Sequence, residues 1–341
     1  LYPDSLKSKP WPYGEVVTDR VPAGVNKTVL QQAINKAMHA TGANHKPAFT
    51  RAVVVVYNGQ IVGEQYAPGF SKDVTMLGWS ISKSLTAALI GILVKQGKLN
   101  AAAPAPVPEW HGTHKQAITV THLLQQTSGL DFTENYSMPS SVTNMLFKKG
   151  DMAAYTARHE LQHKPGTVFN YSSGNSNVLS RIIRHTVGEG AYHSFPYTAL
   201  FYKINAPSFL LEPDASGTYV GSSYSYATAR DFARFGLLYL NNGVWNGAQI
   251  LPEDWVQQTV QPSAADALQH YGYQFWLNGR NKKDPTQRRY PSAPPDLFSA
   301  DGFGGQNIYI IPSRKLVIVR LGLHDLNEDE LLKDVLAAFP N

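Results

Sequence analysis

Ser80 and Lys83 stand three residues apart at the start of a long apolar segment of the chain. Residues at this spacing on a helix share one face, so the hydroxyl and amine heads can meet. A serine hydroxyl becomes a good nucleophile when a base takes its proton, and a lysine can be that base if burial lowers its pKa. The pair predicts acyl transfer through Ser80. In the alternative interpretation, Ser80 caps a core helix and Lys83 extends towards the surface.

The segment after Lys83 predicts the element that positions this pair. It is almost wholly apolar up to Gln96, and Gly97 follows as a good helix-ending residue. A helix that is hydrophobic all round is buried, so we expect it at the centre of the molecule. Ser80 would lie in its first turn, where backbone N–H groups favour a developing negative charge.

Strand patterns occur near both ends of the chain. Residues 51–57 and 60–66 are rich in β-branched residues and flank Asn58-Gly59, a strong signal for a tight hairpin turn. Residues 307–311 and 316–321 predict a second hairpin. Helical spacing is found at residues 25–40 and 328–339.

The middle of the chain has mostly helical patterns and loops. We expect helices at residues 120–126, 141–147, 152–158 and 175–187. The simplest architecture is α+β, with an antiparallel sheet built from both termini and flanked by helices. Residues 1–104 and 218–341 would form this sheet domain, residues 105–217 an inserted, mostly helical domain, and the active site would lie at their junction.

Several further segments carry a family resemblance, by their joint order and spacing. They are Trp79–Thr86 (WSISKSLT), His122–Leu130 (HLLQQTSGL), Lys164–Gly174 (KPGTVFNYSSG), Gly221–Gly236 (GSSYSYATARDFARFG) and Gly302–Pro312 (GFGGQNIYIIP). With these motifs the chain resembles the serine β-lactamase and penicillin-binding family, in its class C-like part. It is most similar there to the esterase and 6-aminohexanoate-oligomer hydrolase branch. The resemblance covers nearly the whole chain from Arg51 onwards.

The resemblance implies roles for three residues. Ser80 would be the acylated serine and Lys83 its hydrogen-bonded base or orienting group. If Lys83 lowers its pKa, Tyr171 would relay the proton to the leaving group and then activate water. The second family motif is Tyr-x-Asn, but here Ser173 replaces the asparagine. The short hydroxyl of Ser173 would contact substrate less well than an amide, which puts β-lactam binding in doubt.

The third family motif is a strand-borne Lys-Thr-Gly or His-x-Gly, and this chain departs from it. Residues 300–306 read Ala-Asp-Gly-Phe-Gly-Gly-Gln, with no cation at the expected place. Losing the contact to a substrate carboxylate ranks β-lactamase and D,D-peptidase activity below esterase or amidase activity. The N–H of Phe303 beside that of Ser80 would form an oxyanion hole, and Gly304 would let substrate approach the backbone. In the alternative interpretation these glycines form only a β-bulge.

Aromatic residues are concentrated in segments expected to line the cleft. Tyr136 and Tyr224 are the candidate substrate contacts among a set that also includes Tyr219, Tyr226 and residues 271–276. Packing in the core or at its edge is the alternative for each of them. Aromatic residues in the cleft would favour an uncharged, partly apolar acyl or amide substrate.

A second catalytic pattern competes with the serine hydrolase hypothesis. Residues 159–163 read His-Glu-Leu-Gln-His, which matches the HExxH pattern of zinc proteases. That chemistry needs both histidines on one helix face. Pro165 follows closely and disfavours helical geometry in the residue before it, so we expect the helix to end before His163 is held in place. A non-catalytic acyl-binding or sensor module of the same fold also stays open.

Composition limits the partners that we expect. The net charge of +5 is spread along the chain without a basic stripe, so no nucleic-acid interface is expected. The absence of cysteine excludes disulfides, thiolate zinc sites and a cysteine nucleophile. The expected partner is a small ester or amide, and the mechanism requires no cofactor or metal. The sequence does not define an oligomeric state.

Location and membrane association follow from weaker signals. The longest apolar run, residues 85–94, is about half of what a bilayer span requires, so no membrane span is expected. The chain begins at Leu1 without a signal-peptide pattern. We expect a leader to have been removed and the protein to be periplasmic or secreted, with the cytoplasm as the alternative.

Overall fold

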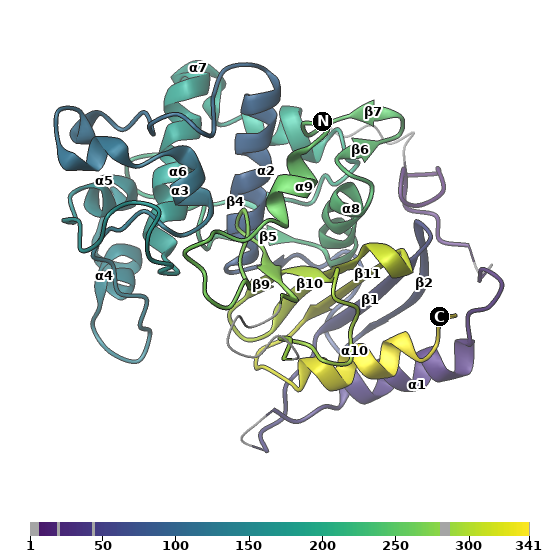
Figure 1. Ribbon diagram of the computed structural model, residues 1–341. Helices are drawn as coiled ribbons and strands as arrows, with labels where there is room; N and C mark the ends of the chain where they lie inside the picture. The colour runs from purple at the N-terminus through teal and green to yellow at the C-terminus, as the bar shows by residue number, and fades with distance from the viewer. Residues whose placement is uncertain (1–6, 19–20, 43–44, 280–286, 341) are drawn as a thin grey trace.

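An antiparallel sheet and its flanking helices organise the computed structural model, which describes residues 7–18, 21–42, 45–279 and 287–340. Six strands lie in the order β2-β1-β11-β10-β9-β8, and all neighbours are antiparallel (Figure 1). Both ends of the chain contribute strands, as the sequence predicts. The strands are β1 (Ala52–Tyr57), β2 (Gln60–Tyr66), β8 (Trp276–Leu277), β9 (Phe298–Gly302), β10 (Gln306–Ile311) and β11 (Leu316–Leu321).

Both predicted hairpins are confirmed. β1 and β2 are joined by Asn58 and Gly59, whose φ angles of 49° and 76° are those that a tight hairpin turn demands. β10 and β11 are joined by a short 3₁₀ turn at Pro312–Arg314, followed by Lys315 in the left-handed region.

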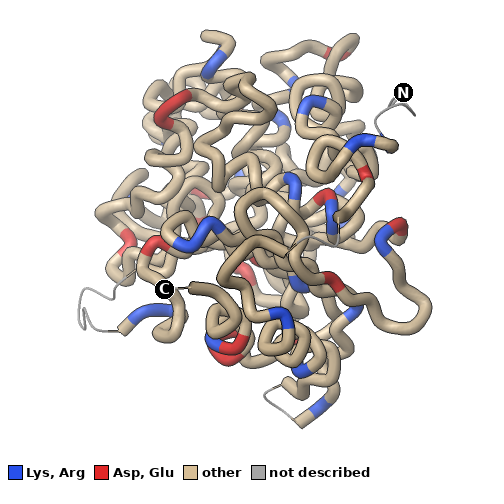
Figure 2. Tube along the Cα trace, turned by 90° about the vertical axis from the view of Figure 1, so that its right-hand side faces the viewer, with Lys and Arg blue, Asp and Glu red and all other residues tan. Residues whose placement is uncertain are grey.

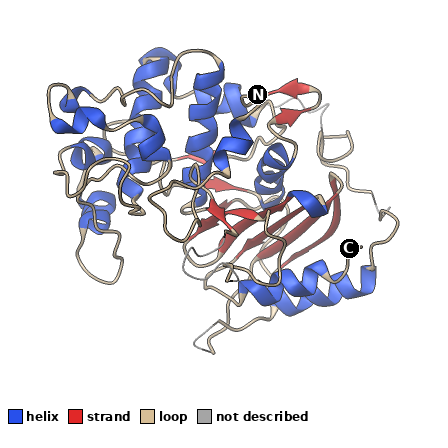
Figure 3. Cartoon of the chain, in the orientation of Figure 1, coloured by secondary structure: helices blue, strands red, loops and turns tan. Residues whose placement is uncertain are grey.

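Helices cover the two faces of this sheet (Figures 1 and 3). The terminal helices α1 (Lys27–Met38) and α10 (Glu328–Leu336) share one apolar cluster with the sheet. The opposite face packs against α2 (Ile81–Lys95) and α8 (Ala229–Leu240). Helix α2 is buried at every position from Ile81 to Leu93, which confirms the predicted central helix.

The middle of the chain is helical, as expected. Its helices and 3₁₀ turns are η2 (Pro108–Trp110), η3 (His114–Ala117), α3 (Val120–Leu124), α4 (Ser141–Lys148), α5 (Met152–Ala157), α6 (Ser173–Val187), α7 (Glu189–Tyr192) and the π-helical η4 (Tyr197–Phe201). One apolar core runs from β1 through α2 into α6. The division into domains at residues 104/105 and 217/218 stays a prediction.

Short elements complete the fold. A three-stranded sheet has the order β3-β5-β4, and a two-stranded one joins β6 and β7. The bounds are β3 (Met76–Leu77), β4 (Leu210–Leu211), β5 (Ser225–Ala227), β6 (Val244–Trp245), β7 (Ala248–Gln249) and α9 (Trp255–Thr259). No helix in the described part of the chain is long and apolar enough to cross a membrane. Charges of both signs are scattered along the chain in Figure 2, without a basic stripe.

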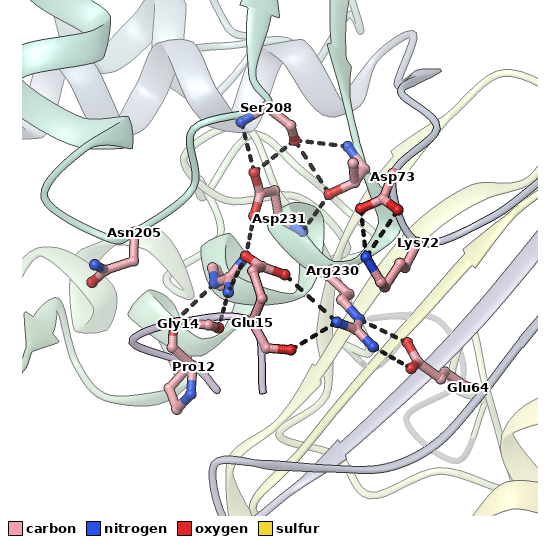
Figure 4. Close-up of polar contacts among 12 residues, drawn as sticks. Pro12, Gly14, Glu15, Glu64, Lys72, Asp73, Asn205, Ser208, Arg230 and Asp231 are labelled. Atoms are coloured by element: carbon pink, nitrogen blue, oxygen red, sulfur yellow. Dashed lines mark hydrogen bonds and ion pairs between the residues drawn. The ribbon is translucent and has the colours of Figure 1, made fainter. Parts of the chain in front are cut away.

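Ion pairs and hydrogen bonds connect the N-terminal arm, residues 7–18, to α8 (Figure 4). The guanidinium of Arg234 is 1% exposed and lies 2.5 Å from the Asp231 carboxylate and 2.9 Å from that of Glu15. It also donates to the backbone carbonyls of Pro12 and Gly14. Arg234 therefore joins the arm to the helix that supports the sheet.

Replacing Arg234 by methionine should destabilise the fold strongly. The change leaves the buried Asp231 carboxylate without its cation, which typically costs about 3–5 kcal/mol. Lys72→Met is the matched control, because Lys72 makes an exposed ion pair with Asp73, a kind worth less than about 1 kcal/mol. Urea denaturation of the three proteins measures both free energies of unfolding. Equal losses in the two variants would contradict the assignment of Arg234 as a buried anchor.

Candidate active site

Ser80 lies at the N-terminal end of α2, directly after a strained turn. Trp79 has a φ of 48°, which is unusual for a bulky residue and is found where surrounding structure fixes the backbone. Its carbonyl accepts hydrogen bonds from the hydroxyl of Ser82 at 2.6 Å and from the Ser82 amide at 3.0 Å. The turn therefore places the Ser80 side chain at the helix end, as the sequence predicts.

Lys83 meets Ser80 from one turn further along α2. Its Nζ lies 3.0 Å from Ser80 Oγ, 3.0 Å from Ser173 Oγ and 2.9 Å from the Ser222 carbonyl. The residue is 1% exposed. Burial lowers the pKa of Lys83 to about 8, while the negative charge of Glu134 opposes this fall. About a tenth of the amine is therefore neutral at pH 7 and can accept a proton, far more than for a lysine with its usual pKa.

Ser173 and Glu134 form the next layer of this cluster. The Ser173 hydroxyl donates to Glu134 Oε1 at 2.5 Å, and its amide donates to Oε2 at 2.8 Å. Ser173 is fully buried at the start of α6. The sequence analysis places Ser173 against substrate, whereas this geometry engages its hydroxyl with Lys83 and Glu134. Glu134 was missed, because no sequence pattern separates it from other acidic loop residues.

Tyr171 lies within this cluster, and its protonation differs from the expectation. Lys83 Nζ sits 5.0 Å from the centre of the phenol ring. Trp276 stacks on the ring at 5.2 Å, and Tyr271 meets it edge-on at 5.6 Å. Burial raises the pKa of Tyr171 well above its usual value, and hydrogen bonding with Ser80 opposes this only in part. The lowering by Lys83 on which the relay would depend is not found, because burial holds the phenol neutral.

The end of β9 comes close to the turn that carries Ser80. A Cβ on Gly302 would lie 2.1 Å from the carbonyl oxygen of Gly78, so only glycine fits at this approach. Among the hydrogen bonds between described residues, none has the Ser80 or Phe303 amide as its donor. These two amides are the predicted donors of the oxyanion hole. Gly304 instead forms the turn packed on Leu323, and its carbonyl accepts from Arg320 at 3.0 Å.

A cation reaches this end of the sheet from a segment outside the motif. Arg289 Nη2 lies 2.6 Å from the carboxylate of Asp301, which occupies the strand where the family carries its Lys-Thr-Gly. The guanidinium also lies 4.6 Å from the centre of the Trp276 ring, and through it neighbours Tyr171. No local sequence pattern indicates this pairing, because only the fold brings the two residues together. The charge of Arg289 is balanced by Asp301.

Aromatic side chains border the nucleophile. The ring of Phe303, 64% exposed, lies 5.9 Å from Trp79 and 6.1 Å from Tyr136. Tyr224 lies 6.3 Å from Trp79, and the Tyr136 hydroxyl donates to Glu134 at 2.8 Å. The structure thus brings the predicted aromatic candidates to the Ser80 turn. Tyr219 lies elsewhere, packed with Tyr192 and His193.

The HExxH segment is not helical. Helix α5 ends at Ala157, before His159, whose Nδ1 pairs with the carbonyl of Tyr155 at 3.0 Å. Within the described ranges, no three His, Asp or Glu side chains are grouped to hold a metal ion. The zinc mechanism needs a continuous helix with both histidines on one face, and this segment does not form one.

The family model described as Beta-lactamase matches residues 30–335. This chain belongs to the beta-lactamase family. It is 27% identical over 301 residues to the 6-aminohexanoate-dimer hydrolase of Paenarthrobacter ureafaciens, covering 80% of this chain and 72% of that protein. The family match and the similarity to this hydrolase agree with the resemblance seen in the motifs. The protein is a serine hydrolase of this family.

Solved structures show the same β-lactamase/transpeptidase-like fold. A penicillin-binding protein homologue from Caulobacter crescentus has a TM-score of 0.72 at 14% identity, covering 95% of this chain and 100% of that one. A family VIII carboxylesterase has a TM-score of 0.68 at 15% identity, covering 92% and 97%. The α+β fold class is thereby confirmed.

The reactivity of Ser80 should follow the titration of Lys83. Only the neutral amine can take the serine proton, so the labelling rate by a fluorophosphonate should rise about tenfold per pH unit below the Lys83 pKa. It should level off above about 8, where burial places that pKa. The labelling rate is measured by intact-protein mass spectrometry between about pH 6 and about pH 10, and Ser80→Ala serves as the control that should not be labelled. A rate independent of pH over this range would contradict Lys83 as the base.

Proposed function

We propose that this protein hydrolyses small ester or amide bonds through an acyl-enzyme on Ser80. The observation that carries the proposal is the contact of 3.0 Å between Ser80 Oγ and Nζ of the buried Lys83, whose pKa is lowered to about 8. A desolvated amine with this pKa is suited to activate a serine at physiological pH.

The remaining groups fit the two halves of such a reaction. Lys83 takes the Ser80 proton as Oγ attacks the carbonyl carbon, and the amides of Ser80 and Phe303 donate to the developing oxyanion. Tyr171, a neutral phenol, donates its proton to the leaving group, and the Lys83 ammonium gives the proton that it took from Ser80 to the phenolate, so that both groups return to their neutral forms. Water then attacks the acyl carbon and gives a proton to the neutral Lys83 amine. The bond between that carbon and Oγ breaks as Lys83 passes this proton to Ser80 Oγ.

The surroundings favour an uncharged acyl group. Aromatic rings border the nucleophile, and the nearby Arg289 has its charge balanced by Asp301. The relation to a 6-aminohexanoate-dimer hydrolase supports linear amides, and that to a carboxylesterase supports esters. β-Lactamase or D,D-peptidase activity ranks second, because the strand lacks the family's free cation. A non-catalytic acyl-binding module would acylate without turnover.

Hydrolysis of p-nitrophenyl butyrate tests the proposal directly. Wild-type protein should release a burst of p-nitrophenol in the first turnover, followed by steady turnover. Ser80→Ala should abolish both, because no acyl-enzyme can form. Stopped-flow absorbance measures the burst, and circular dichroism checks that each variant is folded.

Two further variants separate the roles at the site. Lys83→Ala should lower acylation by at least about 100-fold through loss of the base. Tyr171→Phe should slow amides more than p-nitrophenyl esters, since p-nitrophenolate leaves without a proton. Equal turnover of wild type and Ser80→Ala would exclude Ser80 as the nucleophile, and a burst without turnover would indicate the binding module.

β-Lactams should be poor substrates. Nitrocefin carries a carboxylate, and a missing charge-assisted contact to it costs roughly 1.5–3 kcal/mol, or about 10- to 100-fold in kcat/KM. We expect nitrocefin to fall below p-nitrophenyl butyrate by at least this factor when both are followed spectrophotometrically. Comparable kcat/KM values would instead support the β-lactamase alternative.

A further inference from the structure

Glu134 holds Ser173 with both carboxylate oxygens. The residue comes from the loop after α3, whereas Ser173 begins α6 and Lys83 belongs to α2. Oε1 accepts from the Ser173 hydroxyl at 2.5 Å and Oε2 from its amide at 2.8 Å. Oε1 also accepts from the Tyr136 hydroxyl at 2.8 Å. The two hydrogen bonds from Ser173 to the carboxylate fix the orientation of the Ser173 side chain.

We propose that Glu134 is a positioning residue that directs the lone pair of Lys83 towards Ser80 by fixing the proton of the Ser173 hydroxyl. This inference rests on the proposed function, because it assigns a role in activating Ser80. Glu134 acts through Ser173 and Lys83 and touches neither substrate nor the reacting atoms.

The argument is a count of donors and acceptors. Ser173 has one hydroxyl proton, and an ionised carboxylate can only accept, so that proton points to Glu134. Towards Lys83, the Ser173 oxygen then presents only lone pairs and must accept. The Ser222 carbonyl, 2.9 Å from Nζ, can likewise only accept. Both hydrogens of the neutral amine are thereby committed.

The remaining tetrahedral position of Nζ, which is not used by a hydrogen, faces Ser80. A neutral amine has two hydrogens and one lone pair, and two of the three polar contacts of Nζ use the hydrogens. The lone pair therefore points along the 3.0 Å contact to Ser80 Oγ. Ser80 can then donate its proton to Lys83, which is the first step of acylation.

Without the carboxylate, the Ser173 hydroxyl gains a competing arrangement. Its proton can rotate towards Lys83 and occupy the lone pair, which leaves Nζ donating to Ser80 rather than accepting from it. A fraction of molecules would then hold Ser80 without a base. Glu134→Gln should therefore lower the maximal rate at high pH, where Lys83 is fully neutral.

The charge of Glu134 makes a second, opposite contribution. The charged and titratable groups facing Lys83 are Glu134 from the loop after α3 and the phenol of Tyr171 from the loop before α6. Asp301 on β9 and Tyr271 before β8 act on Tyr171. Because the negative charge raises the pKa of Lys83, its removal should move the acid limb of the rate profile to lower pH.

The test combines these two effects in one pH profile. Fluorophosphonate labelling of Ser80, followed by intact mass, should show in Glu134→Gln a plateau lowered about tenfold or more. The acid limb should move down by about one pH unit. Glu134→Asp, which keeps the charge, should keep the wild-type acid limb.

A matched variant separates positioning from general damage. Glu109→Gln removes a carboxylate that pairs with Arg181 on the same helix as Ser173, at 2.8 Å, away from Lys83. It should leave the acid limb at its wild-type pH even where stability falls. A wild-type plateau in folded Glu134→Gln, whether or not the acid limb moves, would overturn the positioning role. Labelling that persists in Ser80→Ala would instead overturn the proposed function itself.

Discussion

The burial of the Lys83 amine is the constraint on which the rest of the site depends. An ammonium at 1% exposure is costly, and the protein meets this cost by lowering its pKa rather than by pairing it directly with a carboxylate. The three polar contacts of Nζ are a hydroxyl, a second hydroxyl and a carbonyl. An adjacent carboxylate would hold the proton on Lys83, whereas Glu134 acts from behind Ser173 and only moderates the shift.

The fold supplies this burial through the helix that carries the nucleophile. Helix α2 is enclosed on all sides because its sequence is apolar all round, and the sheet and α6 both pack against it. Ser80 lies at the N-terminal end of this helix, where the strained Trp79 turn meets the end of β9 at Gly302. Lys83 is thus desolvated while Ser80 stays half-buried.

Local patterns were enough to predict both hairpins of the main sheet, the central helix and the contact between Ser80 and Lys83, whose catalytic roles stay predictions. The Asn58-Gly59 turn, the apolar helix after Lys83 and the Ser80–Lys83 spacing are short-range features, fixed by a few neighbouring residues. Glu134 and the Arg289–Asp301 pair could not be predicted, because each contact joins segments far apart in the sequence. The neutral state of Tyr171 depends on rings supplied by Tyr271 and Trp276, so the lowering of its pKa on which the relay would depend is not found.

Activation and specificity are carried by different parts of this site. The groups that activate Ser80 come from α2 and from the start of α6, which are buried and fixed by the core. The rings of Tyr136 and Phe303 are exposed and come from loops, as does the Arg289 that balances Asp301. Loops can change without disturbing a packed core. Under the proposed function, substrate choice would therefore depend on the charge and shape that these loops present, while the buried Ser80–Lys83 pair stays unchanged.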